Sequence, residues 1–213
     1  MKDSLRLGRE EVVAERPFSS PDHIVIDKVV LRTMIDEIHR HLFQNQGSLE
    51  EKYAYFFPSE SRWQKRLLLL RPEELQQRSE FVIVGFFGKI SQVVDSDVQS
   101  EIFNVGKTLC QQLWQIPEIL GYSTWLLADE LNYANLVVLK NEEAIAQWRH
   151  TNPHIRAKDI LSPKYYDCVR IYNGRAVFDQ NLETHIINFL RVKYWDYRVS
   201  PTWHAVRQLE MAR

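Results

Sequence analysis

The chain has 213 residues, of which 45% are hydrophobic, 26% charged and 12% aromatic, with six tryptophans. That composition is typical of a globular domain and excludes low-complexity and collagen-like chains. The formal net charge of −1 argues against a dedicated nucleic-acid-binding protein, and no segment reaches the roughly 18 apolar residues of a membrane span, so we expect neither nucleic acid nor membrane as a partner.

The first 22 residues are polar and end in RPFSSPD, so we expect a mobile N-terminal arm over residues 1–22. Acidic residues are scattered through this segment and it has no apolar centre, which argues against a signal peptide. The two cysteines, Cys110 and Cys168, fall on different predicted elements and form no CxxC motif. We therefore expect two reduced, mostly buried thiols in a cytoplasmic protein.

Residues 23–80 predict a mixed α/β region. The segment HIVIDKVVLR, from His23, is rich in β-branched residues and predicts a strand, and MIDEIHRHLFQ then predicts a helix from its apolar spacing. Residues 48–80 leave two alternatives: two helices broken near Pro58, or a short LLLL strand that leads into a helix starting at Pro72. Because the region begins strand-then-helix, it either repeats the fold of the following domain in degenerate form or is an unrelated region.

Residues 81–176 have the clearest pattern. FVIVGFFGKI is continuously apolar, as in a central strand buried on both faces. Residues 96–116 place apolar side chains at helical spacing, after a cap at Asp95 or Ser96. A hairpin, a short helix and a last strand follow, over residues 121–141, 142–150 and 165–174. The order β-α-β-β-α-β predicts a ferredoxin-like α+β domain.

Residues 177–213 predict a helical C-terminal extension. Its apolar residues suggest one partly apolar helix, and Pro201 begins a second, shorter one. We expect this aromatic segment to pack on its own sheet, on the N-terminal region or on a partner subunit. The apolar positions of the first predicted helix are Ile186, Ile187, Phe189, Leu190 and Trp195.

The central segment resembles a known group of proteins. A strand like FVIVGFFGKI, a long helix, the hairpin segment NYANLVVLKNEEAIAQW, and a helix with a histidine just beyond a tryptophan are similar to the dimeric α+β barrel superfamily, and within it to the antibiotic-biosynthesis-monooxygenase-like group. Trp148, Asn152 and His154 match the group's degenerate motif after the third strand. The resemblance covers roughly residues 80–175.

The resemblance implies a homodimer whose sheets pair into an α/β barrel, with a pocket in each subunit between sheet and helices. It implies a cofactor-independent or haem-degrading monooxygenase, with haem as the candidate cofactor. This sequence departs from the haem-degrading members, which carry an asparagine on the first strand, because Asn135 sits on a later strand. That departure weakens the transfer of haem chemistry.

His154 is the candidate catalytic residue. His150 and His154 are four residues apart, but HTNPH lacks the glutamate of a zinc protease. Pro153 separates the pair, because Thr151 or Asn152 caps a new helix there, so we expect no metal site from these two residues. His154 would lie in the first turn of that helix, where the dipole favours a neutral ring able to ligate haem or act as a base. The alternative is a structural, half-buried histidine.

Five further residues are candidate ligand contacts. Trp148 either walls a pocket for a flat aromatic ligand or fills the core. Tyr166 and Arg170 share one strand face, where a buried Arg170 would need a carboxylate or an anionic ligand, while at a dimer seam it would form an interfacial salt bridge. The hairpin supplies the two others, Trp125 and Asn135.

Two functions follow from these residues. The first is a monooxygenase or haem-binding protein acting on a flat aromatic or macrocyclic ligand, with His154 and Trp148 in its pocket. The second is a non-catalytic binding or regulatory scaffold that uses the dimeric barrel. The near-neutral charge and the absent first-strand asparagine favour the second, and the histidine–tryptophan pair favours the first.

Overall fold

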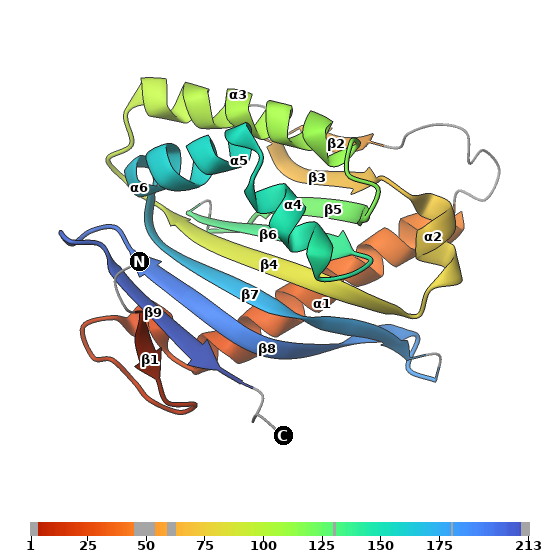
Figure 1. Ribbon diagram of the computed structural model, residues 1–213, viewed down its shortest axis with the longest axis horizontal. Coiled ribbons are helices and arrows are strands. Elements are labelled where there is room, and N and C mark those ends of the chain that lie inside the picture. The colour runs from red at the N-terminus through yellow and green to blue at the C-terminus, as the bar shows by residue number, and fades with distance from the viewer. Residues whose placement is uncertain (1–3, 45–53, 59–62, 130, 180, 210–213) are drawn as a thin grey trace.

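The apolar segments of the chain pair into one nine-stranded sheet in a computed structural model, which describes residues 4–44, 54–58, 63–129, 131–179 and 181–209 (Figure 1). The described strands are β1 (Leu5–Leu7), β2 (Ala54–Pro58), β3 (Trp63–Leu69), β4 (Glu80–Ile90), β5 (Ile119–Leu126), β6 (Asn132–Leu139), β7 (Tyr166–Asp179), β8 (Thr184–Asp196) and β9 (Trp203–Gln208). The described helices are η1 (Pro17–Ser19), α1 (Asp22–Gln44), α2 (Pro72–Gln77), α3 (Ser96–Leu113), α4 (Glu143–Arg149), α5 (Asn152–Arg156), the π-helical turn η2 (Ala157–Leu161) and α6 (Ser162–Tyr165).

The centre of the sheet has ferredoxin-like topology. The full strand order is β1-β9-β8-β7-β4-β6-β5-β3-β2, so the first and last strands of the predicted unit, β4 and β7, pair antiparallel in the middle. The hairpin β5–β6 joins the other side of β4 through β6. The helix α3 and the short helices α4 to α6 supply the two helical connections. The predicted α+β class and the β-α-β-β-α-β order are confirmed.

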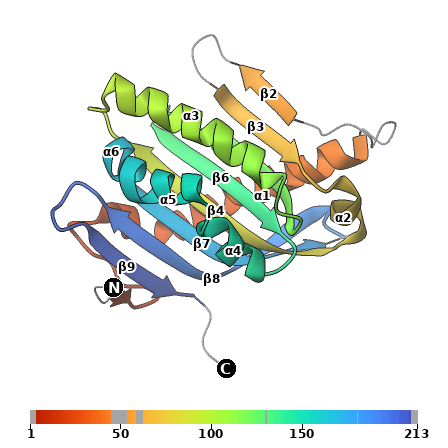
Figure 2. The ribbon, with the colours of Figure 1, turned by 45° about the horizontal axis from the view of Figure 1, so that its top comes forward.

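The helical connections α3 to α6 cover one face of this sheet (Figures 1 and 2). Asp95 caps α3, since its Oδ1 accepts a hydrogen bond from the backbone N–H of Asp97 at 2.7 Å. Apolar residues of α3 and α4 then pack on β4 and β6, with Leu113 and Ala144 fully buried. The break at Pro153 also occurs as predicted, because α4 ends at Arg149 and α5 begins at Asn152 with Thr151 as its N-cap.

The long helix α1 covers the opposite face. It crosses the sheet diagonally, and its buried stripe contacts β8, β6, β5 and β3. The predicted strand from His23 is wrong, since the helix begins at Asp22. The local preference of β-branched residues is weak beside the burial of a helical stripe against a sheet. The stripe consists of Leu31, Met34, Ile35, Ile38 and Leu42, each no more than 3% exposed.

Residues 48–80 follow the second of the two alternatives. The LLLL segment ends β3, and α2 starts at Pro72, where proline suits the first turn of a helix. The two-helix alternative is wrong, because Ala54–Pro58 pairs with β3 as a strand. Without a strand at His23, the region no longer begins strand-then-helix, so the basis for a degenerate repeat is removed.

The C-terminal segment extends the sheet. The predicted helical extension is wrong, because residues 184–196 and 203–208 form β8 and β9. The register shifts between Asn173 and Gly174, which leaves Leu190 as an extra residue in β8. Before the bulge, Ile187 and Phe189 are buried, and after it Val192 and Tyr194 are buried, so the spacing between buried residues changes from two to three at this point. This interruption of the alternation resembles helical spacing.

Residues 4–21, expected to form an arm, lie along β8 and β9. The strand β1 pairs in parallel with β9. The fully buried Arg207 donates hydrogen bonds to the carbonyls of Gly8, Arg9, Glu11 and Ser19. These bonds fix the segment against the sheet.

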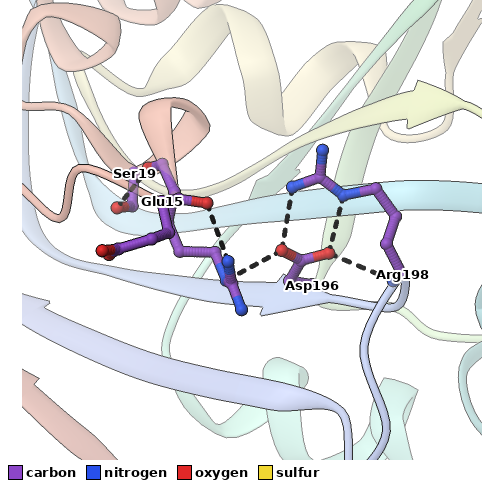
Figure 3. A network of polar contacts seen from close by, with 5 residues as sticks. Glu15, Ser19, Asp196 and Arg198 are labelled. Atoms are coloured by element: carbon purple, nitrogen blue, oxygen red, sulfur yellow. Dashed lines mark hydrogen bonds and ion pairs between the residues drawn. The ribbon is translucent and has the colours of Figure 1, made fainter.

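A second anchor lies at the end of β8 (Figure 3). The carboxylate of Asp196 is fully buried and binds Arg16 at 2.9 Å and Arg198 at 2.8 Å. Arg16 also donates to the carbonyl of Glu15, and its own carbonyl accepts from the Ser19 hydroxyl. A buried carboxylate requires such paired donors, so this network ties the N-terminal segment to β8.

The face that α1 covers is the one through which the sheets of two subunits would pair in the expected barrel. Pairing through this face requires α1 to leave it, which would expose the stripe defined above. None of the helices in the described ranges is long and apolar enough to cross a membrane.

Candidate functional site

Polar side chains form a row between α3 and the sheet. The register places Arg66 of β3 opposite Thr124 of β5, and Thr124 opposite Asn135 of β6. Directly opposed residues of antiparallel strands are close neighbours on one face. Arg66 and Thr124 are only 8% and 3% exposed, so a cation, a hydroxyl and an amide lie together under the helix.

Arg66 joins this row to α3. Its Nη1 donates to the Sγ atom of Cys110 over 2.9 Å. Burial raises the pKa of the Cys110 thiol, although the positive charge of Arg66 acts in the opposite direction. The thiol is therefore protonated at neutral pH and is a weak nucleophile.

The carboxamide of Asn135 has an unused acceptor. Its Oδ1 is buried and has no hydrogen-bond partner among the described residues. Thr124 lies beside it on one strand and Phe86 on the other. A buried acceptor without a donor costs about 1–3 kcal/mol, and such groups are rare in folded proteins unless a ligand or a functional requirement explains them.

Three tyrosines line the same layer. Burial raises the pKa of Tyr133 to about 12, and raises the pKa values of Tyr122 and Tyr166 well above the ordinary range. Tyr122 and Tyr133 nevertheless keep part of their surface in contact with water. Tyr166 packs edge-on against Phe86 at 5.3 Å between ring centroids.

Tyr166 reaches this layer because of a bulge. The register between β4 and β7 shifts at Lys89 and Ile90, which leaves Asp167 as an extra residue. Tyr166 therefore points toward α3, and the prediction that it shares a face with Arg170 is wrong.

His154 and Trp148 lie at the outer side of the same layer. Their rings meet edge-on at 5.3 Å, and Trp148 packs on the apolar cluster that includes Cys110 and Tyr122. The Nδ1 atom of His154 is buried without a hydrogen-bond partner in the described part of the chain. Burial first, and then the charges of Lys158 and Arg149, lower the pKa of His154 to about 4. The ring is therefore neutral at pH 7.

His150 does not join His154 in one site, because it caps the end of α4 while His154 lies in α5. Among the residues that the structure describes, no group of three or more His, Cys, Asp or Glu side chains is placed to hold a metal ion.

Arg170 and Trp125 lie on the other face of the sheet, against α1. Arg170 is a buried cation whose partner is a carboxylate of the same chain: Nε and Nη2 donate to Asp27 at 2.7 and 3.0 Å. The Tyr172 hydroxyl donates to the same carboxylate at 2.6 Å. The ring of Trp125 is half-buried, with the Nζ of Lys65 4.1 Å from its centroid.

Of the six predicted site residues, four lie in the layer that carries α3. These are Asn135, Tyr166, Trp148 and His154, whereas Trp125 and Arg170 take part in packing and pairing with α1 and β3. Sequence analysis missed Arg66, Cys110 and Thr124. Nothing in the sequence marks these three, because their proximity depends on the register of β3, β5 and α3, which no local pattern encodes.

Comparisons with known proteins find similarity in structure only. No family model matches the chain, and no curated protein matches it. Among solved structures, a dimeric ferredoxin-like protein of unknown function from Thermobifida fusca is 18% identical, with a TM-score of 0.34 over 46% of this chain and 91% of its own.

Two other solved structures are described with an activity. A conserved protein of unknown function from Bacteroides thetaiotaomicron, described as a possible oxidoreductase, is 12% identical, with a TM-score of 0.35 over 44% of this chain and 95% of its own. SnoaB from Streptomyces nogalater, a cofactor-independent oxygenase, is 10% identical, with a TM-score of 0.31 over 63% of this chain and 97% of its own. At these TM-scores the neighbours assign no activity to this chain.

Proposed function

We propose that this protein binds a flat aromatic small molecule that carries a hydroxyl group, in the layer between α3 and the sheet. The observation that carries the proposal is the buried, unpartnered Oδ1 of Asn135. A ligand hydroxyl would donate to this oxygen and remove the penalty of an unsatisfied acceptor. The neighbouring rings of Tyr133 and Phe86 suit a flat apolar body, because offset and edge-on ring contacts add to its burial.

Trp148 and His154 are proposed to contact the outer end of the ligand. A histidine with a pKa of about 4 is neutral at pH 7 but a weak base, and efficient general bases have pKa values near the working pH. We therefore assign His154 a binding role in preference to catalysis. Arg170 and Trp125 are outside the proposed site.

The pKa values of the titratable side chains between α3 and the sheet favour binding without acid–base catalysis. This corresponds to the second function expected from the sequence, a non-catalytic binding protein. Burial raises the pKa of Cys110, Tyr122 and Tyr133, and lowers the pKa of His154. None of these four groups exchanges a proton near pH 7. A proton-transfer role would need a group that does.

Oxygenation of the bound ligand is the second candidate function, and the position of Arg66 favours it. A guanidinium next to bound phenol stabilises the phenolate, which is the form that reacts with oxygen. For a ring methylene activated in this way the balanced reaction is CH2 + O2 → C=O + H2O, and the substrate supplies the electrons. No cofactor is required for this stoichiometry.

Haem does not fit the surroundings of His154. Trp148 meets its ring edge-on at 5.3 Å, and the charged groups Lys158, Arg149 and Asp159 act on it. A bound haem needs apolar surroundings on both faces of its porphyrin. Haemin is therefore expected to give no saturable Soret shift that depends on His154.

The first test is a titration with 1-naphthol, followed by intrinsic fluorescence, with naphthalene as the ligand that lacks the hydroxyl. Asn135→Leu should weaken 1-naphthol binding about tenfold or more, and should leave naphthalene binding within about twofold. The same variant should be more stable to urea by about 1–2 kcal/mol, because it removes an unsatisfied acceptor. Loss of stability together with unchanged binding would reject the proposal.

Ser123→Ala is the matched control. Ser123 also carries a buried oxygen without a partner in the described residues, but it lies on the α1 face of β5. Its replacement should leave 1-naphthol binding unchanged.

Oxygen consumption with anthrone, a three-ring ketone with a reactive methylene, tests the second candidate function. Arg66→Met should abolish any oxygen uptake above the rate in buffer alone.

The homodimer and the cytoplasmic location remain proposals. With α1 on the sheet face, a dimer would use another surface, and light scattering after size exclusion measures its mass. The two free cysteines, Cys110 and Cys168, suit a reducing compartment.

A further inference from the structure

The helical layer leaves β8 and β9 uncovered on the α3 side of the sheet (Figures 1 and 2). On this uncovered part, Arg191 and Lys193 of β8 are two residues apart and point to the same face. Arg191 stands opposite Asn173 of β7, and Lys193 opposite Ile171. Two cations therefore lie side by side at the border of the helices.

The helical border adds two more cations. The positive charges of Arg149 at the end of α4 and of Lys158 in η2 both act on Lys193. Arg149 and Arg191 also repel each other. We call the surface formed by Arg149, Lys158, Arg191 and Lys193 the basic face.

The basic face lacks compensating carboxylates. Lys158 pairs with Asp159 at 3.1 Å, but Arg149, Arg191 and Lys193 form no ion pair among the described residues. Four cations therefore face one carboxylate. Burial first, and then the charges of Arg149, Arg191 and Lys158, lower the pKa of Lys193 to about 8, so its ammonium form is destabilised where it stands.

An unpartnered donor points into the same place. Asn173 is 4% exposed, and its Oδ1 accepts a hydrogen bond from Nε of Arg191 at 3.2 Å. Its Nδ2 is buried and has no hydrogen-bond partner in the described part of the chain. An oxyanion would accept a hydrogen bond from the buried amide N–H of Asn173. The same oxyanion would balance the charge of the cations beside it.

We propose that the basic face is a binding site for a phosphate or phosphomonoester group, and that it borders the proposed aromatic site at His154. Arg149 and Lys193 contact the oxyanion directly, and Arg191 is held in place by Asn173. A phosphate dianion balances more of this charge than a single carboxylate does. Guanidinium groups also match the geometry of phosphate oxygens.

The test is calorimetric titration of the full chain with inorganic phosphate and with glycerol 3-phosphate, at fixed ionic strength. We expect one saturable site per chain for both probes. Arg149→Gln and Lys193→Gln should each raise the dissociation constant tenfold or more. Arg149 is an exposed residue at a helix end, so its variant keeps the fold even where a change at Lys193 does not.

Arg175→Gln is the matched control, because Arg175 is a surface arginine of β7 that already pairs with Glu80 at 3.1 Å. It removes the same charge two residues along β7 from Asn173, where Glu80 and Glu142 already pair with it, and should leave the dissociation constant unchanged. Equal weakening by this control would mean non-specific attraction and would overturn the proposal. Absence of saturable binding in the wild type would overturn it as well.

Two further arms identify the source of the phosphate group. Vesicles containing phosphatidic acid present the same phosphomonoester on a lipid. Binding to vesicles as well as to the soluble probes, with loss in Lys193→Gln, supports the site and names a lipid headgroup as a ligand. Binding of a single-stranded RNA without binding of either small probe would replace the proposal with a polymer surface. Loss of 1-naphthol binding in Asn135→Leu is independent of all these outcomes.

Discussion

Arg170 and Asp27 show how a charged pair can serve the fold in place of a ligand. Both side chains are almost fully buried, and Tyr172 completes the coordination of the carboxylate. Removing one partner of such a pair leaves an uncompensated charge, which typically costs about 3–5 kcal/mol. The pair fixes α1 at one rotation on the sheet, so the anion that Arg170 requires is already present in the chain.

The pKa of His154 makes the first prediction at the residue scale. Its folded pKa of about 4 lies below the unfolded value of about 6.5, so protonation favours the unfolded chain. The free energy of unfolding should therefore fall as the pH drops from 7.5 to 5. After discounting for partial solvent contact, we expect about 1–2 kcal/mol of this fall to come from His154.

Urea unfolding of the wild type and His154→Gln at the two pH values measures this contribution. The variant should lose less stability between pH 7.5 and 5, by the amount given above. Other histidines with lowered pKa values act in the same direction in both proteins, so the difference isolates His154. These are His23, His39, His185 and His204. The exposed His150→Gln is the control, and parallel pH profiles for the wild type and His154→Gln would contradict the assignment.

At the scale of the elements, two glycines differ sharply in how closely other atoms approach them. A Cβ on Gly174 of β7 would lie 2.5 Å from the backbone oxygen of Asn188 and 3.1 Å from the Cα of Phe189. These are backbone atoms of β8, at the bulge, and they cannot move without opening the ladder. A Cβ on Gly106 of α3 would meet nothing within 4 Å.

Gly174→Ala should lower the free energy of unfolding by about 2 kcal/mol or more, because it forces β7 and β8 apart. Gly106→Ala should raise it by about 0.5–1 kcal/mol, because alanine favours a helix interior over glycine. Thermal and urea unfolding of both variants provides the measurement. If Gly174→Ala raised the free energy of unfolding, the backbones of β7 and β8 would have to lie farther apart at this position than the structure shows.

The elements also separate what local sequence encodes from what it does not. The unit from β4 to β7 could be predicted because its strands and its long helix each show an apolar run or a regular spacing over most of their length, with the bulge at Asp167 as an exception. The strand β8 could not, since the extra residue Leu190 breaks its alternation and makes the pattern look helical. The start of α1 was missed because Val25, Ile26 and Val29 are apolar yet exposed, which hides the helical stripe behind them.

The same limit applies to the candidate site. The tryptophan–histidine contact could be predicted because the two residues are six positions apart, across a proline that sets the turn. The contact between Arg66 and Cys110 joins residues 44 positions apart. It depends on how β3 adds to the edge of β5, and no periodicity within either segment reports that pairing.

At the scale of the whole molecule, Arg207 joins the N-terminal segment to the last strand. Its guanidinium bonds four backbone carbonyls and the hydroxyl oxygen of Tyr194, and no carboxylate pairs with it among the described residues. A buried cation is stable here because several carbonyl dipoles converge on it and satisfy its donors. Arg207 therefore holds the carbonyls of the segment from Gly8 to Ser19, and the Arg16–Asp196 ion pair is the second anchor of that segment.

Arg207→Met should leave four carbonyls without donors and reduce stability by about 2–4 kcal/mol. Cleavage by a glutamate-specific protease after Glu10, Glu11 and Glu15 should become at least about tenfold faster, because local opening becomes more frequent. Mass spectrometry of the fragments gives the sites and the rates. Arg198→Gln removes a half-exposed arginine from Asp196 and serves as control, and equal acceleration by this variant would refute the special role of Arg207.

The parallel pairing of β1 with β9 also has a mechanical consequence. Suppose that a force pulls residue 4 and residue 209 apart. The two strands run in the same direction, so the force loads their hydrogen bonds in shear, and the bonds must break together. The bonds from Arg207 to the N-terminal carbonyls share that load. A force that pulls the two ends of the described chain apart is therefore resisted by the β1–β9 and Arg207 hydrogen bonds before it acts on the central strands.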